Sequence, residues 1–360
     1  MVTKPAINDP RKMNTDMLRI LAVTNMYPTL ETPVLGTYVE KQIKGLKQIG
    51  LHVAVMFVDR TQKGMRAYLG LGRKVRERLT EFHPDVVHIM YGGVMANEVT
   101  RNVEDRPTVV SFCGSDLLGE NLSGTVRKLI SEYGILASHK AARRTTGIVV
   151  KSKNLHDALP ADVYRSKVRI IPNGVDLEWF QPINRDKCRN RLGWDSKVFH
   201  ILFPANLGDP VKRPKLAQAA VDCLQSMGIR SEMHHLRDVP HDEVPVWLNA
   251  SNAVLLTSLH EGSPNVIKEA LACDLPVVSV NVGDVSERIQ GVDGCYIARP
   301  EPHDLALKLS LVYSGEGRVN GRYKMNEFSL EKTALRLKTL YDHVLQFPVT
   351  KENSDRLHAE

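Results

Sequence analysis

The chain has 360 residues, a length that suggests two domains of ordinary size. Apolar residues make up 42% and charged residues 25%, which excludes a disordered chain and a disulfide-stabilised scaffold. The net charge is +7, but residues 1–175 carry 26 basic and 16 acidic side chains, whereas residues 176–360 carry 22 and 25. The basic half therefore predicts an anionic partner: nucleic acid, an anionic membrane or a phosphorylated substrate.

Short apolar runs alternate with helical patterns along the chain. We expect strands at 19–24, 53–57, 86–90, 108–112, 147–150 and 168–171, and then at 200–204, 231–235, 253–257, 277–280 and 295–298. Helices are expected at 125–143, 213–227, 242–250, 264–273 and 301–313, and before them where Val39, Ile43 and Leu46 recur at helical spacing ahead of Gly50. This alternation predicts parallel sheets covered on both faces, in two doubly wound Rossmann-like domains.

The domain boundary is expected near residue 175, where Pro172, Asn173 and Gly174 form a turn after a strand. We assign 1–175 to the first domain and 176–328 to the second. A last helix at 329–347 has apolar residues at helical spacing, and 348–360 is a tail. Ligands of parallel sheets bind at the carboxyl ends of strands, so the site is expected in the cleft between the domains.

No apolar run approaches the roughly 18–20 residues of a membrane-spanning helix. The first sixteen residues are polar and lack the apolar core of a signal peptide, so we expect a cytoplasmic protein. The five cysteines are scattered without CxxC spacing and are expected as reduced thiols.

The most informative stretch is 258–271, which follows a predicted strand. Ser263 is a good N-cap and Pro264 fits the first helical position. The free N–H groups of Asn265 and Val266 would then face the cleft and suit a diphosphate. Glu261 in the loop and Glu269 in the helix place two carboxylates at different depths of one pocket, where they could accept sugar or ribose hydroxyls. The alternative is a capped surface helix with two solvated acids.

Three further loops follow predicted strands. The loop at 203–214 carries Lys212 and Arg213, which could neutralise a leaving diphosphate or simply be solvated. Gly36 begins a helix and would allow a phosphate to approach the backbone, although a plain turn is the alternative. Cys113 begins the loop 113–116, which is either a sugar-contacting loop or a turn.

A basic amphipathic segment at 60–79 suits an anionic membrane surface, or a solvated helix packed on the first domain. No nucleic-acid-binding module accompanies the positive charge, so nucleic acid is not expected as a partner. The sequence has no GxxxxGK[ST] or strand-linked GxGxxG phosphate loop, no convincing zinc spacing, no GxSxG elbow and no Asp-x-Asp pair for a divalent metal.

Taken in order, these motifs resemble glycosyltransferase family 4, which has the GT-B fold and a retaining mechanism. The resemblance covers about residues 18–347. It rests on the two glutamates Glu261 and Glu269 with seven residues between them, on 171–176 with Phe180 and Pro182, and on the loop 206–213. The first loop resembles the subgroup of bacterial surface-polysaccharide enzymes of the teichuronic-acid type.

The resemblance implies transfer of a sugar from a UDP- or GDP-linked donor to a saccharide or lipid-linked saccharide, without a cofactor or metal. It implies Glu261, Lys212 and Cys113 as catalytic residues. Glu269 would bind the ribose. The other donor-binding residues it implies are Gly262, Ser263, Pro264, Asn265, Val266, Asn206, Arg213, Gly36 and Asn173. The last helix would cross back to the first domain, and the basic half would face an acceptor or the inner face of the plasma membrane.

Two positions depart from the family pattern. Asn206 stands where the family usually has an arginine, and Cys113 stands where it usually has a sugar-contacting histidine. A thiol does not replace the hydrogen bond of an imidazole well. A catalytically weak paralogue that binds a nucleotide-sugar, or a nucleotide-sugar epimerase of the same fold, are therefore the alternatives.

Overall fold

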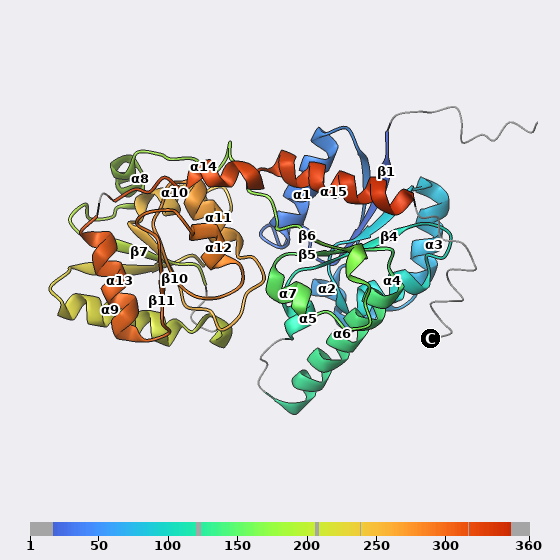
Figure 1. The fold of residues 1–360 in the computed structure, drawn as a ribbon, viewed down its shortest axis with the longest axis horizontal. Coiled ribbons are helices and arrows are strands. Elements are labelled where there is room, and N and C mark those ends of the chain that lie inside the picture. Colours follow the sequence, from blue (N-terminus) through green and yellow to red (C-terminus); the bar gives the residue numbers. More distant parts are fainter. Residues whose placement is uncertain (1–16, 120–123, 206–208, 238, 316, 347–360) are drawn as a thin grey trace, which may run out of the picture.

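The computed structural model describes residues 17–119, 124–205, 209–237, 239–315 and 317–346. They form two parallel sheets flanked by helices, in two halves that lie side by side along the long axis of the molecule (Figure 1). The predicted doubly wound α/β class is confirmed. All eleven predicted strands are present, with ends shifted by no more than one residue.

The first sheet has six strands in the order β2-β1-β3-β4-β5-β6. Its strands are β1 (Arg19–Thr24), β2 (His52–Phe57), β3 (Val86–Ile89), β4 (Thr108–Phe112), β5 (Gly147–Val150) and β6 (Val168–Ile170). Alternate residues face opposite sides: Leu21 and Val23 join one core cluster, whereas Ile20 and Ala22 join another. Both faces are therefore covered, as continuous apolar strands predict.

The helices of this half divide between the two faces. Those helices and turns are α1 (Thr37–Gln48), α2 (Arg60–Lys63), η2 (Gly64–Tyr68), α3 (Leu71–Phe82), α4 (Gly93–Arg101), α5 (Ser115–Leu118), α6 (Thr125–Arg144), α7 (Lys153–Asp157) and η3 (Arg165–Lys167). Helices α3, α4 and α6 share a core cluster on one face, and α1 packs on the other.

The last helix, α15 (Leu330–Leu345), lies on the first sheet beside α1, far in sequence from its neighbours (Figure 1). Its residues Leu337, Leu340 and Tyr341 are buried in the same cluster as Val39 of α1. The Tyr341 hydroxyl lies 2.6 Å from Nδ1 of His88, whose Nε2 lies 2.8 Å from the Ser111 hydroxyl. Burial lowers the pKa of His88 to about 3, so this imidazole is neutral.

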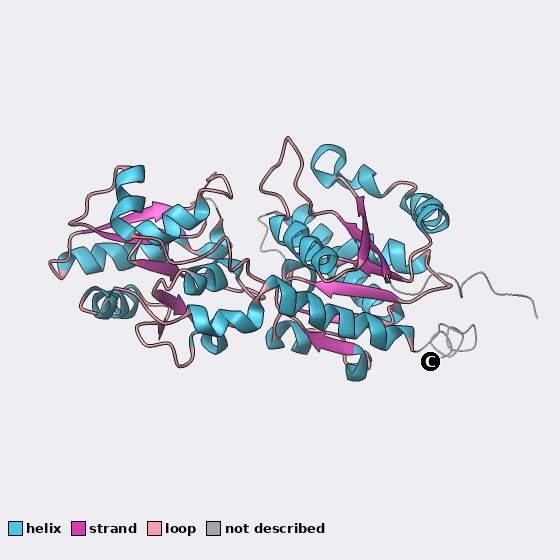
Figure 2. Ribbon diagram, turned by 90° about the horizontal axis from the view of Figure 1, so that it is seen from above, coloured by secondary structure: helices cyan, strands magenta, loops and turns pink. Residues whose placement is uncertain are grey.

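The second sheet has the order β11-β10-β9-β7-β8. Its strands are β7 (Phe199–Phe203), β8 (Ser231–His235), β9 (Ala253–Leu256), β10 (Val277–Val280) and β11 (Tyr296–Ala298). Around it lie α8 (Arg185–Leu192), η4 (Pro210–Lys212), α9 (Pro214–Ser226), α10 (Val244–Ala250), α11 (Asn265–Ala272), α12 (Val285–Ile289), α13 (Pro302–Tyr313), α14 (Arg322–Met325) and η5 (Asn326–Phe328). Figure 2 shows helices on both sides of each sheet.

The segment 60–79 was expected either to suit a membrane surface or to form a solvated helix packed on the first domain. It is not a single helix. It forms α2, η2 and the start of α3, with breaks at Gly64 and Gly70, which both have positive φ. Leu71, Val75 and Leu79 are buried in the core, while Met65 and Leu69 remain exposed. Most of its apolar surface thus packs on the first half of the molecule. Across the described residues no helix is both long and apolar enough to cross a membrane.

Candidate active site

The loops singled out by the sequence meet where the two halves face each other. Asn154, on α7 of the first half, donates from Nδ2 to the Glu261 carbonyl at 2.8 Å. Asn173 donates from Nδ2 to Oδ1 of Asn265 at 3.4 Å. A Cβ on Gly262 would lie 2.6 Å from the Cys113 carbonyl oxygen. The loop after β9 is thus seated directly against the carboxyl ends of β4 and β5.

Glu261 and Lys212 form an ion pair at the centre of this contact. The Lys212 ammonium lies 2.5 Å from Oε1 of Glu261, and the Ser258 hydroxyl donates to the same oxygen at 2.8 Å. Both charged side chains are largely shielded, at 27% and 15% exposure. The pair holds a cation at the end of β7 and a carboxylate at the end of β9, and Oε2 of Glu261 remains available for a hydroxyl group.

Arg213 contacts the end of β9. Its backbone is left-handed, with φ 51°, and its guanidinium donates to the carbonyls of Thr257 and Ser258. The Thr257 hydroxyl donates back to the Lys212 carbonyl at 2.7 Å. Arg213 therefore ties the loop after β7, which carries Lys212, to the end of β9.

Helix α11 begins one residue later than predicted, at Asn265, and Pro264 is its N-cap. The prediction of Ser263 as the capping side chain is wrong. Its hydroxyl lies 2.8 Å from Oδ2 of Asp284 and 2.8 Å from the ammonium of Lys268. Because Lys268 and Asp284 hold the hydroxyl, no capping bond forms, and the N–H groups of Asn265 and Val266 begin the helix uncapped by a side chain.

Lys268 is 1% exposed, so the start of α11 rests on a buried cation. Burial lowers the pKa of Lys268 to about 8, with Asp284 acting in the opposite direction. Asp284 also pairs with Arg288 at 3.0 Å. This network fixes the loop that carries Gly262 and Ser263.

Glu269 lies farther along α11, facing α1 of the other half. Burial raises the pKa of Glu269, and the charges of Lys41 and Lys268 oppose that rise. The Lys41 ammonium lies 4.7 Å from the centre of the Phe180 ring and has no hydrogen-bond partner among residues 17–119, 124–205, 209–237, 239–315 and 317–346. The carboxylate of Glu269 and this ammonium thus lie near each other between the two halves, where they could bind hydroxyl groups and an anion.

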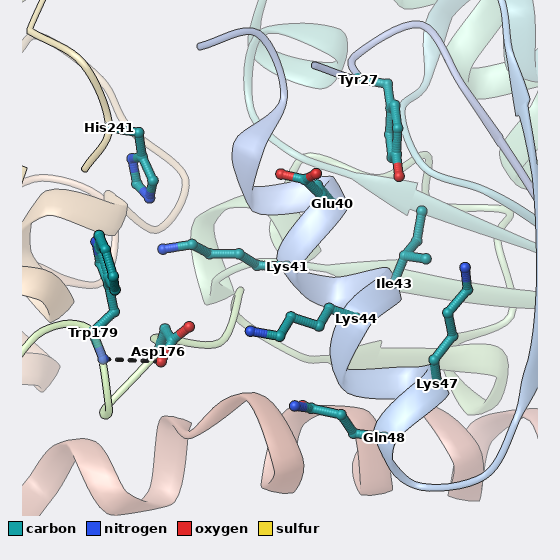
Figure 3. Close-up of a pocket in the computed structure, with 10 residues that line it drawn as sticks. All are labelled: Tyr27, Glu40, Lys41, Ile43, Lys44, Lys47, Gln48, Asp176, Trp179 and His241. Carbon is teal, nitrogen blue, oxygen red and sulfur yellow. Dashed lines mark hydrogen bonds between the residues drawn. The ribbon is translucent and has the colours of Figure 1, made fainter. Parts of the chain in front are cut away.

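A cavity of about 690 Å³ opens beside Lys41, between α1 and the second half (Figure 3). Lys41 and Lys44 extend from α1 toward Trp179 and His241 on the opposite wall (Figure 3). Burial, and then the charge of Lys41, lowers the pKa of His241 to about 4. The imidazole is therefore neutral and can accept or donate a hydrogen bond at neutral pH.

Cys113 sits at the end of β4 in a loop held by a buried carboxylate. Asp116 accepts the N–H groups of Gly92, Cys113 and Gly114 at 2.8–3.1 Å. Burial raises the pKa of the Cys113 thiol to about 12, so it is neutral. A loop braced in this way presents its backbone rigidly to Gly262.

Gly36 is the N-cap of α1, with φ 66°. A Cβ there would lie 2.2 Å from the carbonyl carbon of Met26, so the loop itself requires glycine whether or not a phosphate approaches. Asn206 lies outside the described residues. The sequence analysis singled out the loop 113–116 without a role for Asp116, and it missed Lys41, Asn154 and Lys151. The available signal was the position of Lys151 directly after β5 and of Lys41 on α1.

Two family models match successive parts of the chain. Residues 35–179 match the model described as Glycosyltransferase Family 4, and residues 207–314 match Glycosyl transferases group 1. The chain therefore carries a glycosyltransferase family 4 domain followed by a group 1 glycosyl transferase domain. The first match covers the half with Gly36 and Cys113, and the second covers the half with Glu261 and Glu269.

Curated relatives of this chain are distant in sequence. A D-inositol 3-phosphate glycosyltransferase of Paenarthrobacter aurescens is 27% identical over 203 residues, 48% of this chain and 49% of the relative. The chain thus spans about half the length of the first such relatives. The putative teichuronic acid biosynthesis glycosyltransferase TuaC of Bacillus subtilis is 24% identical over 336 residues, 75% of this chain and 82% of the relative.

Solved structures show the GT-B fold for this chain. Sucrose-phosphate synthase from Thermosynechococcus elongatus superposes with a TM-score of 0.73 at 15% identity, covering 91% of this chain and 99% of that one. Anabaena Alr3699/HepE in complex with UDP-glucose gives 0.64 at 18% identity, covering 90% and 100%. UDP-GlcNAc 2-epimerase from Methanocaldococcus jannaschii gives 0.57 at 9% identity, covering 91% and 100%.

Proposed function

We propose that the protein is a retaining glycosyltransferase that moves a sugar from a nucleotide-sugar to a saccharide or lipid-linked acceptor in cell-surface polysaccharide synthesis. The observation that carries the proposal is the ion pair of Lys212 with Glu261, in the loop that leads into α11 and at the contact with the first half of the molecule. This arrangement supplies a cation and free N–H groups for a diphosphate, and two carboxylates for hydroxyl groups.

In the proposed reaction the acceptor oxygen bonds to the anomeric carbon on the face from which the phosphate leaves. The bond from that carbon to the phosphate oxygen breaks, and its electron pair stays on the phosphate. The departing phosphate takes the proton of the acceptor hydroxyl, so no protein base is required. The barrier falls because Lys212 and the N–H groups of Asn265 and Val266 stabilise the negative charge that develops on the leaving group.

The donor is proposed to be UDP- or GDP-linked, with its ribose on Glu269. A complex of the distant structural neighbour HepE contains UDP-glucose, which supports a nucleotide-sugar as ligand of this fold. We further propose that no metal or organic cofactor takes part, because the chain's own cations and amides occupy the place where charge develops. Donor-binding roles for Gly262 and Asn173 fit their position at the contact between the halves.

We also propose peripheral attachment to the inner face of an anionic membrane. The charge balance of +10 in residues 1–175 supports it, as do exposed apolar side chains on α6. Those side chains are Leu129, Ile130, Tyr133 and Leu136, each more than half exposed. Sedimentation with phosphatidylglycerol vesicles, but not with phosphatidylcholine vesicles, is the expected result; equal partition into both would exclude charge-driven attachment.

The experiment that tests the proposed reaction follows transfer from UDP- and GDP-sugars to simple saccharides and polyprenyl-linked saccharides. We expect a glycoside whose anomeric configuration matches that of the donor, as determined by NMR. Inversion of configuration would contradict the retaining mechanism. An epimerised nucleotide-sugar formed without acceptor would instead identify an epimerase, and binding without any turnover would identify a catalytically weak paralogue.

A further inference from the structure

Lys151 follows β5 directly and lies beside Cys113. Phe112 of β4 and Val150 of β5 are register partners, so the next residue of each strand is also adjacent, across roughly 4.8 Å of sheet. The side chains of Phe112 and Val150 enter the core cluster shared with α4 and α6. Because successive side chains alternate, Cys113 and Lys151 point to the opposite face, toward α1 and the cleft.

The Lys151 side chain is largely buried, at 2% exposure. Among the described residues, the groups whose charges favour its protonated form are Cys113 and Asp116. The nearby carboxylate of Asp116 is already engaged by three backbone N–H groups, and the Cys113 thiol is neutral. Burial lowers the pKa of Lys151, with Cys113 and Asp116 opposing this. Burying an ammonium whose charge is only partly balanced by a neighbouring carboxylate costs free energy, and an anionic ligand would reduce that cost.

The other half of the molecule covers this ammonium at the reacting centre. The loop with Glu261 and Gly262 rests on the Cys113 carbonyl and on Asn154, three residues after Lys151. From the far side, the charge of Lys151 contributes to the lowered pKa of Lys268 beneath the start of α11. Lys151 therefore lies between the cysteine loop and the proposed diphosphate site.

We propose that the Lys151 ammonium binds an anionic oxygen of the substrate at the reacting centre. The inference rests on the proposed function. Two parts of a donor could supply that oxygen: the phosphate next to the sugar, or a carboxylate on the transferred sugar. In either case Lys151 supplies a strong N–H donor beside Cys113, whose thiol is a weak one.

The test compares Lys151→Met with wild type. Methionine has a similar length and no charge, so it removes the ammonium without opening a large cavity. Because the substitution removes the cost of burying an ammonium, the ligand-free variant should melt at or above the wild-type temperature. Lys153→Met is the matched control, since Lys153 lies two residues away, is 70% exposed and pairs with Asp157 on the surface.

Affinities are then measured by calorimetry for UDP, UDP-glucose and UDP-glucuronate, and for GDP, GDP-mannose and GDP-mannuronate. Loss of one hydrogen bond to a charged group predicts a fall of about 10- to 100-fold. A fall for every nucleotide identifies the phosphate as the ligand, whereas a fall for the uronate donors alone identifies the sugar carboxylate. Lys153→Met should bind as wild type does.

Unchanged affinities of Lys151→Met for all six ligands, while wild type binds, would overturn this inference and leave the proposed function standing. A lower melting temperature of ligand-free Lys151→Met would also overturn it, because it would assign Lys151 a structural role. Wild-type protein that binds none of the nucleotides would overturn the proposed function and the inference together.

Discussion

Replacing Gly262 by alanine tests how tightly the two halves must close. No positive φ is needed at this position, so the substitution adds one methyl group without backbone strain. That methyl would lie 2.6 Å from the Cys113 carbonyl oxygen and 2.9 Å from Cδ1 of Leu155, both in the other half of the molecule. Each half should therefore fold normally, and only their approach is obstructed.

The size of the effect follows from these contacts. Inserting a methyl group into a close-packed contact costs about 1–3 kcal/mol. Opening the contact instead sacrifices the hydrogen bond from Asn154 to the Glu261 carbonyl, worth about 1 kcal/mol. Closure is thus less favourable by about 1–3 kcal/mol, which lowers kcat/KM roughly 5- to 150-fold.

The assay combines steady-state transfer kinetics with thermal unfolding. Gly262→Ala should keep the wild-type melting temperature and lose activity. Gly134→Ala is the matched control, because Gly134 lies in α6 without a positive φ and with no atom within 4 Å of its added Cβ. Activity of Gly262→Ala within twofold of wild type would refute the closed contact as the active arrangement.

Three further outcomes are expected. Lys212→Met should lower kcat by about 10²-fold or more, because a charge that stabilises the leaving phosphate is lost. Lys215→Met, on the exposed start of α9, should leave kcat unchanged. Equal kcat values for Lys212→Met and wild type would show that Lys212 takes no part in the reaction. Tyr341→Phe leaves Nδ1 of buried His88 unpaired and should lower the free energy of unfolding, measured in urea, by about 1–3 kcal/mol. Tyr323→Phe, at an exposed position, should leave it unchanged. Identical urea midpoints for Tyr341→Phe and wild type would show that the hydrogen bond between His88 and α15 does not stabilise the fold. The pKa of His88 is about 3 in the folded protein and near 6.5 in the unfolded chain, so between these pH values the unfolded chain binds one more proton. The free energy of unfolding should therefore fall below pH 6.5 by up to about 1.4 kcal/mol per pH unit because of this histidine. If the free energy of unfolding of His88→Asn depended on pH as that of wild type does, His88 would not be the cause.

Most strands could be predicted because they are short apolar runs that alternate with helical patterns, whereas β8, with the sequence Ser-Glu-Met-His-His, was predicted from its place in that alternation. The helix start at α11 could not be predicted, because Asp284 from the loop after β10 and Lys268 compete for the Ser263 hydroxyl. That competition is a tertiary contact, invisible to local pattern. The contact of Arg213 with the Thr257 carbonyl could not be predicted for a related reason, because it depends on a left-handed backbone at Arg213 and on a distant segment.

The burial of Lys151 also could not be predicted from the local sequence. A lysine after a strand predicts a solvated side chain, yet the register of β4 with β5 and the covering loop at Gly262 bury it. The segment 60–79 had the composition of a membrane-surface helix, but the breaks at Gly64 and Gly70 let its apolar residues reach the core. For Lys151 and for the segment 60–79, packing between segments distant in sequence determines which side chains are buried.

The proposed function requires that Glu269 hold the nucleotide-sugar between the two halves. The decisive measurement is calorimetric titration of UDP- and GDP-sugars into wild type, Glu269→Ala and the exposed control Glu331→Gln. We expect wild type and Glu331→Gln to bind at least one donor with the same affinity, and Glu269→Ala not to bind it. Equal binding by Glu269→Ala would exclude this role of Glu269, and no binding by wild type would exclude the proposed function.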